Sequence, residues 1–269
     1  PLDLHIHSLI MRGGSVSYDQ YDVAPTQGRF NAAHLSVSDI SAHLILNCLT
    51  PDSLNLNCKR LSLAEQAGLH LKALSFHLVA GKRGATLTDF HLELPHTQLV
   101  IPQLAASYEW QHGIVSVSSI NSNGDIAQTT ITPSDITCFL PLFKNFTSAL
   151  HLSTSFSGTS SSLRVKKLDI HSDDKSLNLL LGGSATKTAE GIRWAVQIGR
   201  LTASARTVEF VSENLKGQKV SVPEVVSRLG NVTFSGEAGG AGNALSTRGI
   251  LQTDAGTARL LLGLHDRKF

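Results

Sequence analysis

The sequence has few cysteines, a small net charge and no long apolar run. Each of these features excludes a class of protein. Three cysteines in 269 residues cannot build the disulfide framework of a small secreted domain. The net charge is only +2, so charge gives no argument for binding to nucleic acid. No stretch approaches the roughly 20 apolar residues of a membrane-spanning helix, and no signal peptide is visible. The length allows one large β domain or two smaller ones.

The three cysteines are expected to be free thiols. Cys48 and Cys58 flank the turn 50–53, and a tight hairpin there places Cys48 opposite Asn55. Cys58 then points to the other face of the hairpin, so a disulfide bond would need a bulge or a longer loop. Free thiols leave the redox compartment undecided.

The dominant signal is alternation of apolar and polar residues. Within TLTDFHLELPHTQLVIP (86–102), the apolar residues at 90, 92 and 94 share one parity, and the polar residues at 89, 91 and 93 take the other. This alternation is typical of a strand with one apolar and one polar face. Similar runs separated by polar turns predict an all-β fold, a meander of strands at 2–7, 43–49, 54–63, 69–79, 113–120, 149–156, 163–170, 176–183, 192–201 and 257–264. Within 69–79 the apolar phase changes between Leu71 and Leu74, which predicts a bulge.

Two short helices are expected to interrupt the strands. TPSD (132–135) combines a Thr cap, Pro at the first helical position and Asp three residues after the cap, which predicts a capping helix near 133–145. SVPE (221–224) repeats this pattern and predicts a second helix near 222–230.

The segments after these helices also match each other. SFSG (155–158) follows the first predicted helix and TFSG (233–236) follows the second, which indicates a degenerate internal repeat. Repeats of this kind build elongated arrays instead of closed globules. We therefore expect a first β-meander over 1–130 and a second, helix-containing region over 131–269, joined in one continuous elongated unit.

Motifs for catalysis or for metal binding are missing. His5 and His7 share a strand face with Asp3, but a zinc site needs three or four converging ligands, and no second pair is placed to complete one. There is no G-x-S-x-G nucleophile motif and no phosphate-binding loop with its lysine. We expect no enzyme activity, no cofactor and no metal.

Composition leaves open what covers the apolar strand faces. Leucine-rich faces can interdigitate in a closed sandwich, or they can line an open apolar groove. The same residues turn inward in both cases, so the sequence pattern does not separate the two.

Residues 28–102 resemble the N-terminal part of TamB-like proteins of Gram-negative envelopes. The closest likeness lies in LTPDSLN (49–55), EQAGL (65–69) and DFHLELPHTQL (89–99). Other segments resemble patterns of the wider AsmA superfamily, namely ITPSDITCFLPLF (131–143), LGNVTFSGEAGG (229–240) and GILQTDAGTARLLL (249–262). All of these motifs are structural, and none is catalytic.

The resemblance implies a long U-shaped antiparallel β-groove, apolar inside and polar outside. Such proteins are anchored in the inner membrane, cross the periplasm and are thought to carry phospholipid to the outer membrane. TamB-like proteins also pair with a barrel-assembly partner and are linked to outer-membrane protein insertion. This sequence shows neither the membrane anchor nor the C-terminal domain of the family, so it is expected to be a middle segment of the bridge.

On this hypothesis the groove-facing, lipid-binding residues are Leu74, Phe76, Leu78, Phe90, Leu92, Leu94, Leu99 and Ile101. Each methylene group exposed to water costs roughly 0.8 kcal/mol, so two acyl chains of about fifteen methylenes each would cost on the order of 24 kcal/mol if fully hydrated. An apolar strand face would shield them from water.

Two other functions fit the same pattern. A structural adapter or chaperone for outer-membrane protein assembly would act through protein–protein contacts, binding polypeptide by strand addition at exposed sheet edges. A carbohydrate-binding or adhesin-type β domain would need exposed aromatic side chains, for which Tyr18 and Tyr21 are the best candidates. We rank the adhesin hypothesis last because aromatic residues make up only 6% of the sequence.

Overall fold

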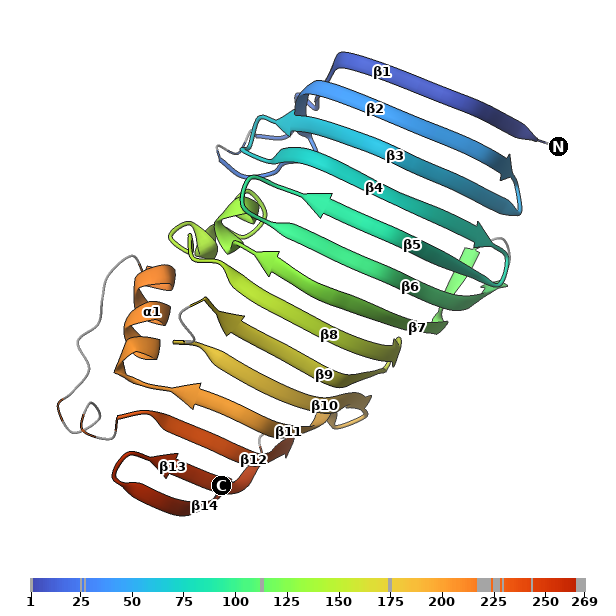
Figure 1. The fold of residues 1–269 in the computed structure, drawn as a ribbon. Coiled ribbons are helices and arrows are strands. Elements are labelled where there is room, and N and C mark those ends of the chain that lie inside the picture. Colours follow the sequence, from blue (N-terminus) through green and yellow to red (C-terminus); the bar gives the residue numbers. More distant parts are fainter. Residues whose placement is uncertain are drawn as a thin grey trace.

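The chain forms one long antiparallel sheet. The computed structural model describes residues 2–24, 26, 28–111, 114–173, 176–216, 224, 228, 230–242 and 244–264. Within these residues fourteen strands pair in chain order, each with its sequence neighbours, so that β1 lies at one edge and β14 at the other. Figure 1 shows the strands stacked side by side from β1 at the top to β14 at the bottom. The predicted all-β fold with an elongated antiparallel sheet is confirmed.

The strands are β1 (Leu4–Asp19), β2 (His34–Thr50), β3 (Ser53–Glu65), β4 (His70–Gly81), β5 (Gly84–Glu93), β6 (Gln98–Gln111), β7 (Ile114–Ile131), β8 (Leu150–Thr159), β9 (Ser162–Ser172), β10 (Asn178–Thr188), β11 (Gly191–Ala203), β12 (Val232–Ala241), β13 (Ala244–Thr253) and β14 (Gly256–Leu264). The sheet continues without a break past residue 130, because β7 pairs with both β6 and β8. The two predicted regions therefore share one sheet.

The two ends of the strands differ in how the chain turns. At one end, here called the short-turn end, the described connections span two residues each, as at 51–52, 82–83 and 160–161. Two-residue turns fix the register of the strands they join. At the other end, the long-loop end, the connections include 20–33, 132–149 and 204–231. Figure 1 shows the helical elements projecting from this end.

A small conventional core lies at the long-loop end. The 3₁₀ turns η1 (Pro133–Ile136) and η2 (Pro141–Phe143) and the helix α1 (Ala205–Lys216) meet there. Phe146 is 7% exposed and makes edge-to-face ring contacts with Phe143, at 6.2 Å between centroids, and with Phe210 of α1, at 5.8 Å. These rings join α1 to the connection before β8.

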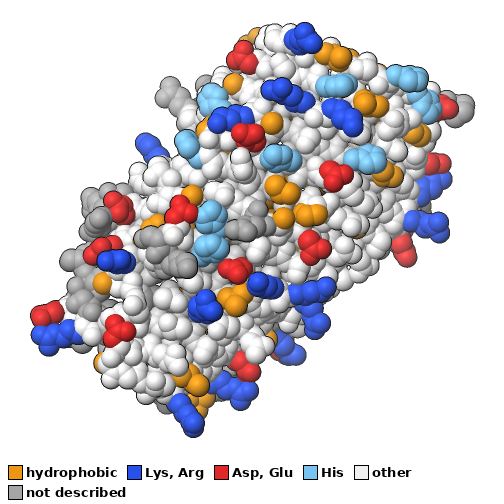
Figure 2. All heavy atoms as spheres, viewed as in Figure 1, with side chains coloured by type: hydrophobic (Ala, Val, Ile, Leu, Met, Phe, Trp, Pro, Cys, Tyr) orange, Lys and Arg blue, Asp and Glu red, His pale blue; other side chains and the backbone are white. Residues whose placement is uncertain are grey.

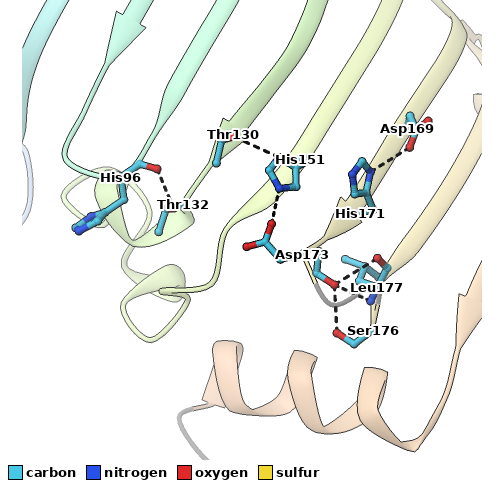
Figure 3. Close-up of polar contacts among 10 residues, drawn as sticks. His96, Thr130, Thr132, His151, Asp169, His171, Asp173, Ser176 and Leu177 are labelled. Carbon is cyan, nitrogen blue, oxygen red and sulfur yellow. Dashed lines mark hydrogen bonds and ion pairs between the residues drawn. The ribbon is translucent and has the colours of Figure 1, made fainter.

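The helix predicted near 133–145 is not an α-helix but the two 3₁₀ turns, and its capping box does not form. The Thr132 side chain donates to the His96 carbonyl at 3.1 Å instead of capping (Figure 3), and Asp135 accepts the His96 backbone N–H at 2.8 Å. Both capping side chains thus bind the β5–β6 connection. Pro141 begins the second turn, so the first cannot continue as a helix.

The helix predicted near 222–230 lies mostly outside the described residues. The twelve-residue helix α1 was not predicted. Its buried side includes polar residues, since Thr207 is 8% exposed and Asn214 is 4% exposed. Thr207 donates to the Ser176 carbonyl, and the Asn214 side chain accepts from the Ser148 N–H at 3.4 Å. The sequence did carry a signal for this helix, because Val208, Val211 and Leu215 follow the i, i+3, i+7 spacing of an apolar stripe.

Bulges shift the phase of several strands. The predicted bulge in β4 is confirmed, because Leu71 pairs with Leu63 and Leu74 with Leu61, leaving one extra residue on β4. A second bulge occurs at Asp89 in β5, whose φ is 53°. Aspartate tolerates this left-handed conformation better than most residues.

The predicted hairpin register is confirmed, with Cys48 opposite Asn55. The three cysteines are free, also as predicted. Cys58 is 1% exposed, and burial raises the pKa of its thiol above the ordinary value. Burial likewise raises the pKa of Cys138, so neither buried thiol favours the reactive thiolate.

Gly236 and Gly249 face each other on β12 and β13, where the backbones approach too closely for side chains. A Cβ on Gly249 would lie 2.4 Å from the Ser235 carbonyl oxygen and 2.6 Å from Cε2 of Phe234. We expect Gly249→Ala to lower the free energy of unfolding by about 2 kcal/mol, because backbone must move to admit the methyl group. Urea denaturation measures this loss.

The matched control is Gly81→Ala. A Cβ there meets a single atom, the Asp52 carbonyl oxygen at 3.7 Å, which is ordinary contact. Its free energy of unfolding should change by less than about 0.5 kcal/mol. Equal losses in the two variants would contradict the close approach of β12 and β13.

Candidate functional site

One row of side chains crosses the whole sheet at a single level. Residues paired directly across antiparallel strands lie on the same face, so the register defines the row. This central row consists of Ile6, Leu46, Leu56, Leu78, Leu87, Leu104, Gly124, Phe156, Val165, Gly183, Val196, Ala238, Thr247 and Leu262. Only Thr247 carries a polar group. With strands about 4.8 Å apart, the row runs about 60 Å.

A second row of the same kind lies nearer the short-turn end. This outer row consists of Leu4, Leu49, Leu54, Ala80, Ala85, Ala106, Ser122, Gly158, Leu163, Ala185, Trp194, Gly240, Leu245 and Leu264. Ser122 is its only polar member. The face that carries the central and outer rows is called the apolar face below, and the opposite face is called the polar face.

No second sheet covers the apolar face among the described residues. The strands make their tertiary contacts with their neighbours in the sheet, and α1 contacts β11 and η2 at the long-loop end. The accessible surface of the chain is 17224 Å², whereas a compact monomer of 28.8 kDa would expose roughly 11,000 Å². The excess excludes a closed sandwich and leaves a single-layer sheet with an open apolar face.

The predicted lipid-binding residues fall mostly on this face. Three neighbouring rows contain seven of them: Leu74, Leu92 and Leu99 in one, Phe76, Phe90 and Ile101 in the next, and Leu78 in the central row. The rings of Phe76 and Phe90 stack with centroids 6.5 Å apart. All seven are partly exposed, so a ligand lying on the apolar face could touch them.

Leu94 differs from the other seven. It lies just past the end of β5, where its N–H donates to the Thr97 carbonyl at 2.9 Å, and it is only 4% exposed. It is therefore buried at the β5–β6 connection and is not available to a ligand. The sequence alternation that joined it to Leu92 ends at this turn.

The polar face carries scattered charged and histidine side chains (Figure 2). The rings of His151 and His171, on β8 and β9, lie in a tilted arrangement with centroids 5.1 Å apart. His151 contacts the Asp173 carboxylate at 2.5 Å, and His171 contacts Asp169 at 3.5 Å (Figure 3). Among the described residues, no three His, Cys, Asp or Glu side chains come together as a metal site would require.

Two open hollows also lie on the polar face. One, of about 670 Å³, spans β6 to β10 and is lined by small polar residues such as Asn123 and Ser157. The other, of about 1140 Å³, spans β9 to β14 and includes Arg164, Gln197 and Arg248. Both are on the opposite side of the sheet from the predicted lipid-binding residues, so neither is the predicted groove.

Comparison of the chain with protein-family models, curated proteins and solved structures gave no match. The resemblance to TamB-like proteins therefore stays a prediction that rests on the segments quoted above. Among the described residues, no helix is both long enough and apolar enough to cross a membrane.

His34 ties the 20–33 connection to the sheet. Its Nδ1 lies 3.0 Å from the Asp19 carboxylate, and its Nε2 lies 2.7 Å from the Val23 carbonyl. Because both ring nitrogens face acceptors, the imidazolium form satisfies both contacts. The hydrogen bond to Asp19, followed by that to Val23, raises the pKa of His34 above 6.5.

We expect NMR titration to give a His34 pKa above 6.5 in the folded protein. A raised folded pKa means that the charged contact stabilises the fold below the ordinary pKa, and that this contribution is lost as pH rises through the raised pKa. Asp19→Asn should lower the measured pKa, because the neutral amide attracts the imidazolium less strongly. A His34 pKa at or below 6.5 would contradict the contact.

Proposed function

We propose that this chain is a non-enzymatic, lipid-carrying segment that binds phospholipid acyl chains along its apolar face. It would form part of a periplasmic bridge between the inner and outer membranes of a Gram-negative envelope. The observation that carries the proposal is the central row, which is apolar from Ile6 on β1 to Leu262 on β14 except at Thr247 and has no second layer over it in the described residues.

The chemistry of the face suits a sliding ligand better than a fixed one. Acyl chains of a phospholipid cost on the order of 24 kcal/mol to hydrate fully, so a water-filled gap needs continuous apolar cover. In the central and outer rows the strand backbones already pair with each other, and the side chains are alkyl or aromatic with two hydroxyl exceptions, Ser122 and Thr247. Many weak contacts of this kind would hold a lipid without fixing it at one position.

The cellular setting is supported by resemblance alone. The TamB-like segments imply an inner-membrane anchor elsewhere in a longer protein, a barrel-assembly partner in the outer membrane and a role in outer-membrane biogenesis. On this proposal the phospholipid is the cargo, and nucleic acid has no part in the function.

The test is mass spectrometry of phospholipid that co-purifies with the detergent-free protein. We expect bound phospholipid in the wild type and an at least roughly tenfold loss in Leu92→Glu, because a carboxylate on the apolar face must be desolvated beside an acyl chain. His91→Glu is the matched control, since His91 is the preceding residue on β5 and points to the polar face.

Circular dichroism must show that both variants keep the β-sheet signal. Phospholipid loss from both variants alike would place the binding elsewhere than on the apolar face. A folded wild type that neither carries phospholipid nor takes it up from added lipid would overturn the proposal.

The second candidate, an adapter or chaperone for outer-membrane protein assembly, is favoured by one observation. The edge strand β14 is apolar and exposed, with Leu261 82%, Leu262 56% and Leu264 65% exposed. Exposed edge strands can bind polypeptide by strand addition. A folded, lipid-free protein that binds unfolded outer-membrane strands would support this function instead.

A further inference from the structure

Four consecutive apolar residues stand exposed at the long-loop end. Phe139, Leu140 and Leu142 are 49%, 48% and 67% exposed, and Pro141 between them is also exposed. This segment, Phe139–Leu142, is called the apolar tip below. Folded proteins rarely leave a run of this kind in water unless it has a binding role.

The apolar tip is held in place on both sides. Cys138, just before it, is 3% exposed, and its carbonyl accepts the Phe30 N–H at 2.9 Å. The Phe30 ring lies 5.2 Å from that of Phe139. After the tip, Phe146 is buried, and its carbonyl accepts the Ser134 N–H at 2.9 Å. The tip is therefore flanked on both sides by hydrogen-bonded residues.

Two exposed cations flank the tip, whereas Glu65, the acid whose charge acts on Cys138, is only 5% exposed. Lys144 follows it in the chain and Arg29 precedes Phe30, and both are exposed. The only acidic residue in the 132–149 connection is Asp135, whose side chain is 4% exposed and is bound to His96. An apolar surface flanked by cations complements an anionic lipid headgroup region.

The size of the tip argues against a stable protein partner. Three side chains exposed to about half their area offer on the order of 300 Å², whereas a stable protein interface needs about 800 Å² from each partner. A bilayer sets no such minimum, because a few apolar side chains with flanking cations bind it reversibly at the headgroup boundary.

We propose that the apolar tip inserts into the headgroup–acyl boundary of a phospholipid bilayer, with Lys144 and Arg29 at the anionic headgroups. This inference goes beyond lipid carriage and stands independently of it, because it rests on the long-loop end and not on the apolar face. Docking there would bring the ends of the strands to the bilayer surface.

The experiment is co-sedimentation of the protein with vesicles of phosphatidylethanolamine and phosphatidylglycerol. We expect Leu142→Glu to reduce the partition coefficient at least about tenfold, since it replaces a buried leucine by a charge in the bound state. Leu261→Glu is the control, because Leu261 is 82% exposed on β14, far from the tip, and should bind as the wild type does. Lys144→Ala should weaken binding and flatten its salt dependence.

Equal sedimentation of Leu142→Glu, Leu261→Glu and the wild type would overturn the proposal, as would failure of the wild type to sediment. Leu142 is largely exposed, so its replacement should leave the circular dichroism spectrum unchanged. Leu92→Glu separates this proposal from the preceding one. It should lose co-purifying phospholipid and still sediment with vesicles, whereas Leu142→Glu should do the reverse.

Discussion

Hydrogen-bonded pairing between neighbouring strands is the interaction on which the rest of this structure depends. Most domains bury a core between two layers, but here one sheet carries nearly the whole chain and only a small core forms at the long-loop end. Stability must come from the backbone ladders and from side-chain contacts along each face. The arrangement is nearly one-dimensional, because each strand depends on two neighbours, as in repeat proteins. The same single-layer arrangement leaves the apolar face uncovered in the described residues.

The continuity of the apolar face depends on bulges as much as on alternation. In β5, Leu87 and Phe90 differ in parity, yet Leu87 pairs with Leu78 and Phe90 stacks on Phe76, both on the apolar face. The left-handed residue Asp89 between them absorbs the extra position. A sheet with perfect alternation would have turned one of these side chains to the polar face. The bulges therefore keep apolar residues together while the strands bend.

Local patterns were predictable from the sequence, and features that depend on distant partners were not. Alternation correctly predicted most of the strands and the β4 bulge, and the hairpin turn predicted the pairing of Cys48 with Asn55, because all of these depend on near neighbours in the chain. It missed β12 and β13, and it missed the turn at 94–97 that divides 86–102 between β5 and β6. The 3₁₀ turns in place of a helix could not be foreseen, since Asp135 binds a residue 39 positions away. The helix α1 was missed although its apolar residues follow helical spacing. Its polar contacts with Ser148 and Ser176 join residues that are distant in the chain and could not be predicted. The fourteen-residue rows across the sheet could not be predicted either, because they depend on the register shifts of every strand pair.

The even number of strands among the described residues has a mechanical consequence. β1 begins and β14 finishes at the short-turn end, on opposite edges of the stack (Figure 1). A force pulling those two edges apart acts along the stack, which is the direction of the hydrogen bonds between antiparallel strands. Loaded in this direction, the bonds of a strand pair open successively instead of resisting together. Under tension the strand pairs would therefore separate one after another, and the sheet would lengthen in steps.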